Sequence, residues 1–160
     1  MKKKMKQVFK SEAYQYFKYA MWTFGGLALE LVYAFLLEPI IYGHSMNEFT
    51  TVECMIHWSL TSITWVLVAF LILRSANKNL DFQLKGKDNK WTLQGVLASL
   101  VLIGLMIVVN YVDLGKLKIV HEFYVLGALK FTFQHFYYLA EVALFTLIVV
   151  FGQNSLEKFF

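Results

Sequence analysis

The sequence has little cysteine, proline and charge. The single cysteine, Cys54, excludes a disulfide within the chain and any metal cluster built from cysteines alone. Charged residues make up only 16% of the 160 residues, whereas a soluble domain has about a quarter. Hydrophobic residues make up 58% and aromatic residues 18%. This composition argues against an ordinary soluble domain and favours a chain that is surrounded by lipid.

Charge is almost absent from four long stretches of the chain. A helix that rises 1.5 Å per residue needs about 20 apolar residues to cross a hydrocarbon layer about 30 Å thick. Each stretch has about that length. The sequence therefore predicts an all-α fold, a polytopic integral membrane four-helix bundle in a single domain, with spans over residues 19–42, 54–73, 92–112 and 131–152.

The segments between these spans differ in character. Residues 74–91 are polar and rich in Asn and Lys, which predicts a connecting loop. From Ile119 to Gly152 the chain is almost continuously apolar, which is too long for one straight span. Gly127 and Lys130 divide this run. We expect an outer interfacial segment over residues 114–130 before the fourth span, and a fifth short helix is the alternative.

Basic residues are distributed unevenly between the two ends of the predicted spans. Three of the fifteen, Lys116, Lys118 and Lys130, fall on one side, and the other twelve fall on the opposite side. By the positive-inside rule, both termini and the 74–91 loop are predicted to be cytoplasmic, in a multi-pass protein of the cell membrane. Because these lysines flank spans, they indicate contact with the lipid bilayer and its anionic headgroups and no nucleic-acid partner.

Polar residues recur inside the apolar stretches. Glu53, His57, Thr61 and Thr64 are spaced by four, four and three residues, so they share one stripe of a helix.

Depth estimated from the rise per residue places the other polar groups at two levels. Glu30 and Glu141 lie near the midplane, and Glu38, His57 and His135 lie about 9 to 12 Å toward the outside.

The two midplane carboxyls are costly in lipid. A carboxylate at the bilayer centre costs about 2.5 to 3.5 kcal/mol on the mild insertion scale. The spans contain no basic residue deep enough to neutralise Glu30 or Glu141. Such groups are protonated, share a proton or hold a cation, which predicts proton or cation coupling. The structural alternative is a protonated carboxyl that hydrogen-bonds a backbone or tyrosine partner.

The outer set predicts a different chemistry. Two histidines and a glutamate, here His57, His135 and Glu38, are a common zinc set that leaves a position for an activated water. Glu53, one turn from His57, would then serve as the catalytic base or orient the imidazole. On a helix, however, His135 lies about 120° from Glu141, so both cannot face one bundle axis. A haem held by His57 and His135 is a further alternative.

The predicted fourth span also carries a family resemblance. The segment 131–153, which contains Phe131-x-x-x-His135 and Glu141, resembles a segment of small bacterial membrane proteins near the CAAX-protease and bacteriocin-immunity (Abi) superfamily. The resemblance covers about a sixth of the chain and implies a helical intramembrane protease in which His135 and Glu141 are the candidate catalytic residues. The Glu-Glu-x-x-x-Arg motif of that superfamily is absent from this sequence.

These observations leave three functions open. The first is an intramembrane metal-dependent hydrolase that uses the outer His/Glu set. The second is a transporter or ion-coupling membrane subunit that uses Glu30 and Glu141. The third is a non-catalytic immunity or assembly partner, in which packing at Gly25 or Gly26 matters more than the polar groups. The small size of the chain favours a homo-oligomer or another membrane protein as its partner.

Overall fold

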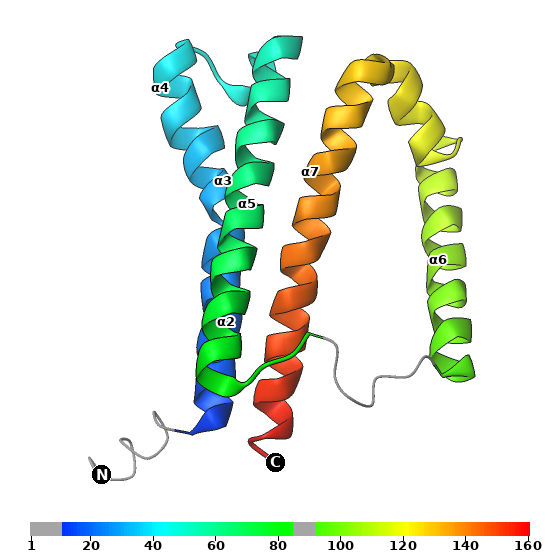
Figure 1. The fold of residues 1–160 in the computed structure, drawn as a ribbon. Helices are drawn as coiled ribbons and strands as arrows, with labels where there is room; N and C mark the ends of the chain where they lie inside the picture. The colour runs from blue at the N-terminus through cyan, green and yellow to red at the C-terminus, as the bar shows by residue number, and fades with distance from the viewer. Residues whose placement is uncertain (1–10, 85–91) are drawn as a thin grey trace. The chain divides into compact units, whose positions relative to one another are not determined.

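A computed structural model describes residues 11–84 and 92–160 (Figure 1). Within these ranges the regular structure is helical and includes no strand. Four helical stretches are long and apolar enough to cross a membrane, namely Glu12–Tyr42, Thr51–Leu80, Leu93–Leu114 and Lys118–Glu157. The four predicted spans fall within these helices, except that Thr92 caps the third. The all-α prediction with four membrane-length helices is confirmed.

The chain divides into two compact units. Unit 1 comprises the chain up to Phe82 together with Phe133–Phe160, and unit 2 comprises Gln83–Thr132. The last long helix contributes residues to both units.

In unit 1, the first membrane-length stretch is built from four consecutive pieces. α2 (Glu12–Leu27) begins at Ser11, whose side chain accepts a hydrogen bond of 3.3 Å from the amide of Tyr14. α3 (Leu29–Val32), the π-helix η1 (Tyr33–Leu37) and α4 (Glu38–Tyr42) follow. Gly43, with a φ of 77°, ends the stretch in the left-handed conformation that glycine adopts most readily.

Pro39 explains the position of the π-helix. A proline inside a helix donates no backbone hydrogen bond, and its ring clashes with the carbonyl four residues earlier. That carbonyl belongs to Phe35, which lies in the middle of η1. The wider turn of a π-helix relieves this clash without ending the helix. The effect of Pro39 on the helix is therefore a π-bulge in the turn before it.

The second long helix of unit 1, α5 (Thr51–Leu80), follows a short 3-10 helix, η2 (Met46–Glu48). A capping box starts α5: the amide of Thr50 donates to Glu53 over 2.7 Å, and the amide of Glu53 donates to the hydroxyl of Thr50 over 3.3 Å. The helix continues through 74–80, where the sequence predicted a loop. Ala76 is buried in the core, and Ser75 and Asn79 hydrogen-bond the hydroxyl of Tyr19, so contacts with α2 stabilise two further turns of α5. Residues 85–91 of the predicted loop lie outside the described part.

Aromatic and small side chains form the core of unit 1, between α2, α5 and the second half of α7 (Lys118–Glu157) (Figure 1). The hydroxyl of Ser155 donates to the carbonyl of Ala13 over 2.8 Å, so the end of α7 lies beside the start of α2. The core residues are Tyr16, Tyr19, Ala20, Trp65, Ile72, Ala76, Phe82, Ala140, Leu144, Leu147 and Phe151.

One glycine of the predicted Gly25-Gly26 pair permits close packing of α2 on α5. A Cβ atom at Gly26 would clash with Cγ1 of Val68, whereas a Cβ atom at Gly25 would meet nothing within 4 Å. Gly26 is therefore the packing glycine.

Unit 2 contains α6 (Leu93–Leu114) and the first part of α7. Thr92 caps α6 by accepting a 3.1 Å hydrogen bond from the amide of Gly95, and α6 has no buried residue. In α7, Gly127 has a non-helical backbone, with φ 73° and ψ 162°, and separates two helical parts. The sequence suggested a division of the apolar run at Gly127 or Lys130, and the break occurs at Gly127.

Candidate functional site

Two glutamates flank one histidine inside unit 1. His57 Nδ1 lies 2.8 Å from Oε2 and 3.0 Å from Oε1 of Glu38, and His57 Nε2 lies 3.5 Å from Oε1 of Glu30. His57 is 1% exposed and Glu38 is 3% exposed, while the side chain of Glu30 is 24% exposed. We call these three residues the Glu–His–Glu centre. Each ring nitrogen of the imidazole faces one carboxylate.

The π-helix brings the two glutamates to one face. In a regular α-helix, eight residues rotate by about 800°, so Glu30 and Glu38 would point about 80° apart. A π-bulge accommodates one extra residue in a turn, so the two glutamates are related as residues seven apart, within about 20° of each other. The bulge at η1, which Pro39 favours, is thus the local reason why both carboxyls reach His57 on α5.

Tyr137 on α7 completes the contacts of Glu30. Its hydroxyl donates a 2.6 Å hydrogen bond to Oε1 of Glu30, and its ring lies against His57 and Trp65 at centroid distances of 6.4 Å and 5.0 Å. The indole of Trp65, which is fully buried, donates over 3.2 Å to the carbonyl of Leu27, at the end of α2. Residues of four helices, α3, α4, α5 and α7, therefore meet here, and the ring of Tyr137 packs beside the imidazole.

The polar stripe predicted on α5 exists, with different roles along it. His57 and Thr61 are buried, and Thr64 lies 2.9 Å from the hydroxyl of Tyr33 in η1. Glu53 belongs to the capping box and lies 3.3 Å from Nε2 of His44. The observed contacts of Glu53 are thus those of a helix cap.

An aromatic side chain from the loop before α5 lies next to the centre. Phe49 packs edge-on against His57 at 6.4 Å and against Tyr42 and His44 at 5.3 Å and 5.8 Å. The His44 and Glu53 side chains beside it are 30% and 18% exposed. Phe49 therefore lies between His57 and the partly exposed side chain of His44, at the end of unit 1 that carries this loop.

Charge balance in the centre requires a proton or a cation. The sequence has no Lys or Arg between Lys18 and Arg74, and none between Lys130 and Lys158. With both carboxyls ionised and the imidazole neutral, the centre carries two negative charges, and one proton on His57 leaves one. Net charge away from water is costly, so the centre favours uptake of a further positive charge.

The predicted zinc set is not assembled around one point. Among the described residues, no three His, Cys, Asp or Glu side chains are grouped as a metal ion requires. Glu38 contacts His57 directly, and the ring of His135 packs edge-on against Tyr138 at 5.8 Å. These contacts provide no argument for zinc or haem, and both stay predictions.

The expected separation into a midplane level and an outer level is wrong for Glu30. This carboxyl lies beside His57, so it belongs with the outer Glu38. The difference arises because the π-bulge and the packing of α2 on α5 set the relative height and rotation of the side chains. Glu141 lies one helical turn beyond Tyr137 on α7, and the midplane Glu30–Glu141 pairing stays a prediction.

The sequence analysis missed Tyr137. Among the residues of the fourth span it singled out His135 and Glu141, whereas the hydroxyl of Tyr137 reaches Glu30. The available signal was its spacing of four residues from Glu141, which places both on one helical face.

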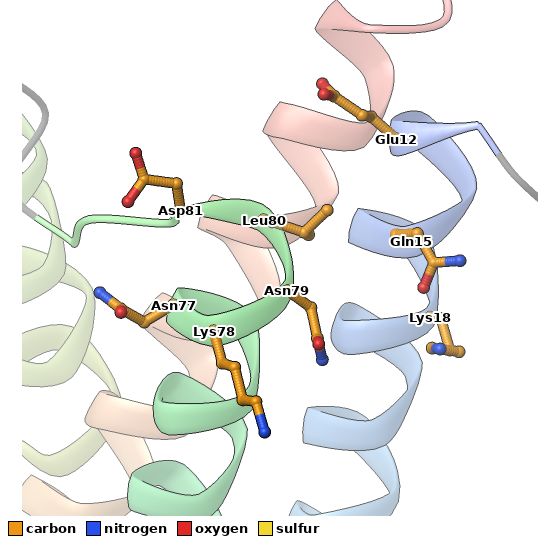
Figure 2. A pocket seen from close by; sticks show the side chains of 8 residues that line it. All are labelled: Glu12, Gln15, Lys18, Asn77, Lys78, Asn79, Leu80 and Asp81. Atoms are coloured by element: carbon orange, nitrogen blue, oxygen red, sulfur yellow. The ribbon is translucent and has the colours of Figure 1, made fainter.

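A hollow at the other end of unit 1 does not form a comparable site. As Figure 2 shows, its side chains point in different directions, with Asp81 and Gln15 on opposite sides. Glu12 pairs with Lys158, and Lys18 lies 4.9 Å above the ring of Trp22. The residues that line it are Glu12, Gln15, Lys18, Asn77, Lys78, Asn79, Leu80 and Asp81.

Comparison of the chain with models of known protein families, with curated proteins and with solved structures found no match. The resemblance to the CAAX-protease and bacteriocin-immunity superfamily therefore stays a prediction.

Proposed function

We propose that this protein is an ion-coupling membrane protein that binds and releases a proton at the Glu–His–Glu centre. The observation that supports the proposal is the imidazole of His57 between two carboxylates, 2.8 Å from Glu38 and 3.5 Å from Glu30. Histidine is the side chain whose unperturbed charge changes near physiological pH. An apolar helical unit with such a group has the parts that proton relays use in membranes.

The two sides of the imidazole have different tasks in this proposal. Glu38 is buried and accepts from Nδ1, so it holds the ring in one orientation and keeps that proton in place. Glu30 is partly exposed and faces Nε2, so it exchanges the mobile proton. When the proton leaves Nε2 for Glu30, the imidazolium becomes neutral and the carboxylate becomes a carboxylic acid. The hydroxyl of Tyr137 holds Glu30 during this exchange.

The proposed topology follows from the basic residues. Lys158 pairs with Glu12, so the start of α2 and the end of α7 lie at one end of unit 1. The basic residues at this end make it the cytoplasmic side, and His44 and Glu53 then lie on the outer side. Protons from the outside would reach the centre past Phe49 and His44.

Proton uptake by lipid vesicles tests this function. Purified protein would be reconstituted with a pH-sensitive dye trapped inside, and the outside would be acidified. We expect faster internal acidification than in empty vesicles, and loss of this increase in Glu30→Gln. Glu157→Gln, which changes an exposed carboxyl at the end of α7, is the matched control and should behave as the original protein.

Two results would overturn the proposal. One is acidification that is equal in the original protein and in Glu30→Gln, when both are folded and inserted in equal amounts. The other is near-stoichiometric zinc in the purified protein that disappears in His57→Ala, which would favour the metal-dependent hydrolase.

A further inference from the structure

Two buried polar atoms beside the centre have no hydrogen-bond partner within the described residues. They are Nε2 of His57 and Oγ1 of Thr61. His57 is 1% exposed and Thr61 is 0% exposed. The two residues are four apart on α5, so their side chains lie one above the other on the same face.

The other hydroxyls of this part of α5 behave differently. Ser59 and Ser62 donate to the carbonyls of Met55 and Trp58, four residues earlier, over 2.7 Å and 2.6 Å. Helix geometry thus allows a hydroxyl here to bond its own helix, and Thr61 does not do so. A buried hydroxyl without a partner is costly, and buried polar groups that lack a protein partner are commonly bridged by a water molecule with about three hydrogen bonds.

Glu30 supplies a third polar group, close to Nε2 of His57. Its Oε1 lies 3.5 Å from Nε2 of His57, which is longer than a normal N–H···O hydrogen bond of about 2.9 Å. The same oxygen already accepts from Tyr137, which holds the carboxyl in place. A direct transfer from His57 to Glu30 would require this contact to shorten.

From these contacts we infer that Thr61 holds a water molecule against Nε2 of His57, and that this water carries the proton between His57 and Glu30. The N–H bond at Nε2 breaks as an O–H bond forms on the water. Another O–H bond of the water breaks as an O–H bond forms on Glu30. The water is regenerated, the imidazolium becomes neutral and the carboxylate becomes an acid. The water site is inferred from the two unpartnered buried atoms alone, whereas the role of the water as a proton carrier depends on the proposed function.

Substitution of Thr61 tests the site. Thr61→Val keeps the shape of the side chain and removes the hydroxyl, whereas Thr61→Ser keeps the hydroxyl. Ser62→Ala is the matched control, because it removes a hydroxyl that bonds only its own helix. These variants would be compared with the original protein in lipid bilayers.

Solid-state NMR of protein with ¹⁵N-labelled histidine gives the readout. The His57 signals are identified by their loss in His57→Asn, and magnetisation transfer from water to Nε2 is measured. We expect strong transfer in the original protein, Thr61→Ser and Ser62→Ala, and at least a several-fold decrease in Thr61→Val. Equal transfer in Thr61→Val, or no transfer in the original protein, would overturn the water site. A His57 signal that shifts when sodium replaces potassium would overturn it in favour of a bound cation.

Proton uptake measured on the same vesicles separates the two proposals. A decrease of about tenfold or more in Thr61→Val supports the water as the carrier. Unchanged uptake in Thr61→Val, together with lost water transfer, overturns the carrier role and leaves the proposed function intact. If the original protein takes up no protons while water transfer is present, the proposed function fails and the water site remains.

Discussion

The two ends of unit 1 are built from the same three long helices and differ in what they bury. One end, which we call the aromatic end, packs Phe151 against Tyr16, Tyr19 and Phe82 at centroid distances of 6.4, 5.5 and 4.8 Å. The other, the polar end, contains the Glu–His–Glu centre, Tyr137 and Thr61. Among the described residues of the aromatic end, no buried side-chain polar atom lacks a hydrogen-bond partner. The hydroxyl of Tyr19, for example, bonds Ser75 and Asn79.

The comparison indicates that the aromatic end holds the helices together and that the polar end carries the groups that can bind a proton. Close packing at the aromatic end fixes α2, α5 and α7 without any need for ions. The polar end brings together a buried imidazole, a buried carboxyl and a partly exposed carboxyl, and two of its buried polar atoms have no partner among the described residues. This is a costly arrangement that helix packing alone does not require. Substitutions at the aromatic end should therefore change stability, and those at the polar end should change proton binding.

The largest effect on stability is expected at the aromatic end. Phe151→Ala removes a fully buried ring that contacts three aromatic side chains, and should lower the free energy of unfolding by about 3 to 5 kcal/mol. Denaturant unfolding in detergent, followed by tryptophan fluorescence, measures this. Phe145→Ala removes a ring that is 49% exposed and serves as the control. Equal losses in the two variants would contradict the assignment of the core to this end.

A smaller loss is expected at the polar end. Tyr137→Phe removes the hydrogen bond to Glu30 and should cost about 1.5 to 3 kcal/mol if that carboxyl is ionised. The same variant should change the pH at which Glu30 takes up a proton, observed by infrared spectroscopy of the carboxyl group. Tyr111→Phe, which changes a tyrosine of α6 that is 54% exposed, is the control. A change in stability without any change in proton uptake would make Tyr137 a packing residue only.

Substitutions of the two neighbouring glycines should have different effects, because only Gly26 lies at the contact between α2 and α5. Gly26→Ala places a methyl group against Val68 and should cost about 1 to 3 kcal/mol through overpacking. Gly25→Ala adds a methyl group in open space and should be neutral or slightly stabilising, because alanine favours helix. Thermal unfolding of the two variants measures the difference. Equal behaviour would show that α2 and α5 do not approach this closely.

The smallest effect is expected from the exposed ion pair at the end of α7. A hydrogen bond from the Lys158 ammonium to Glu12, and then the charge of that carboxylate, raise the pKa of Lys158 above its usual value. A raised lysine pKa stabilises the fold below the unfolded pKa of about 10.4, and this contribution is lost as the pH rises through the folded pKa. Lys158→Gln should therefore lower the Tm slightly at pH 7. The difference should vanish well above pH 10.4 and shrink in high salt; a difference that persists there would implicate packing.

The membrane-length helices could be predicted from the sequence because their causes are local. Composition and length identify a helix that lipid can surround, and residues such as Thr50 and Gly127 mark where helices begin or break. The polar stripe on α5 could also be predicted, because residues that are three or four positions apart, such as His57 and Thr61, lie on one face of a helix. The extension of α5 through residues 74–80 was missed, because polar Asn and Lys residues are typical of both loops and exposed helix ends.

The sequence alone predicts a helical chain whose long helices can cross a membrane, and it shows that no lysine or arginine lies between Lys18 and Arg74, the stretch that holds Glu30 and Glu38. Only the tertiary structure decided which groups meet. Glu30 and Glu38 reach one histidine because a π-bulge before Pro39 rotates one of them, and Tyr137 joins because α7 packs on α2 and α5. Pro39 favours the bulge locally, but the packing of whole helices on one another depends on contacts between distant residues, which no local pattern in the sequence encodes.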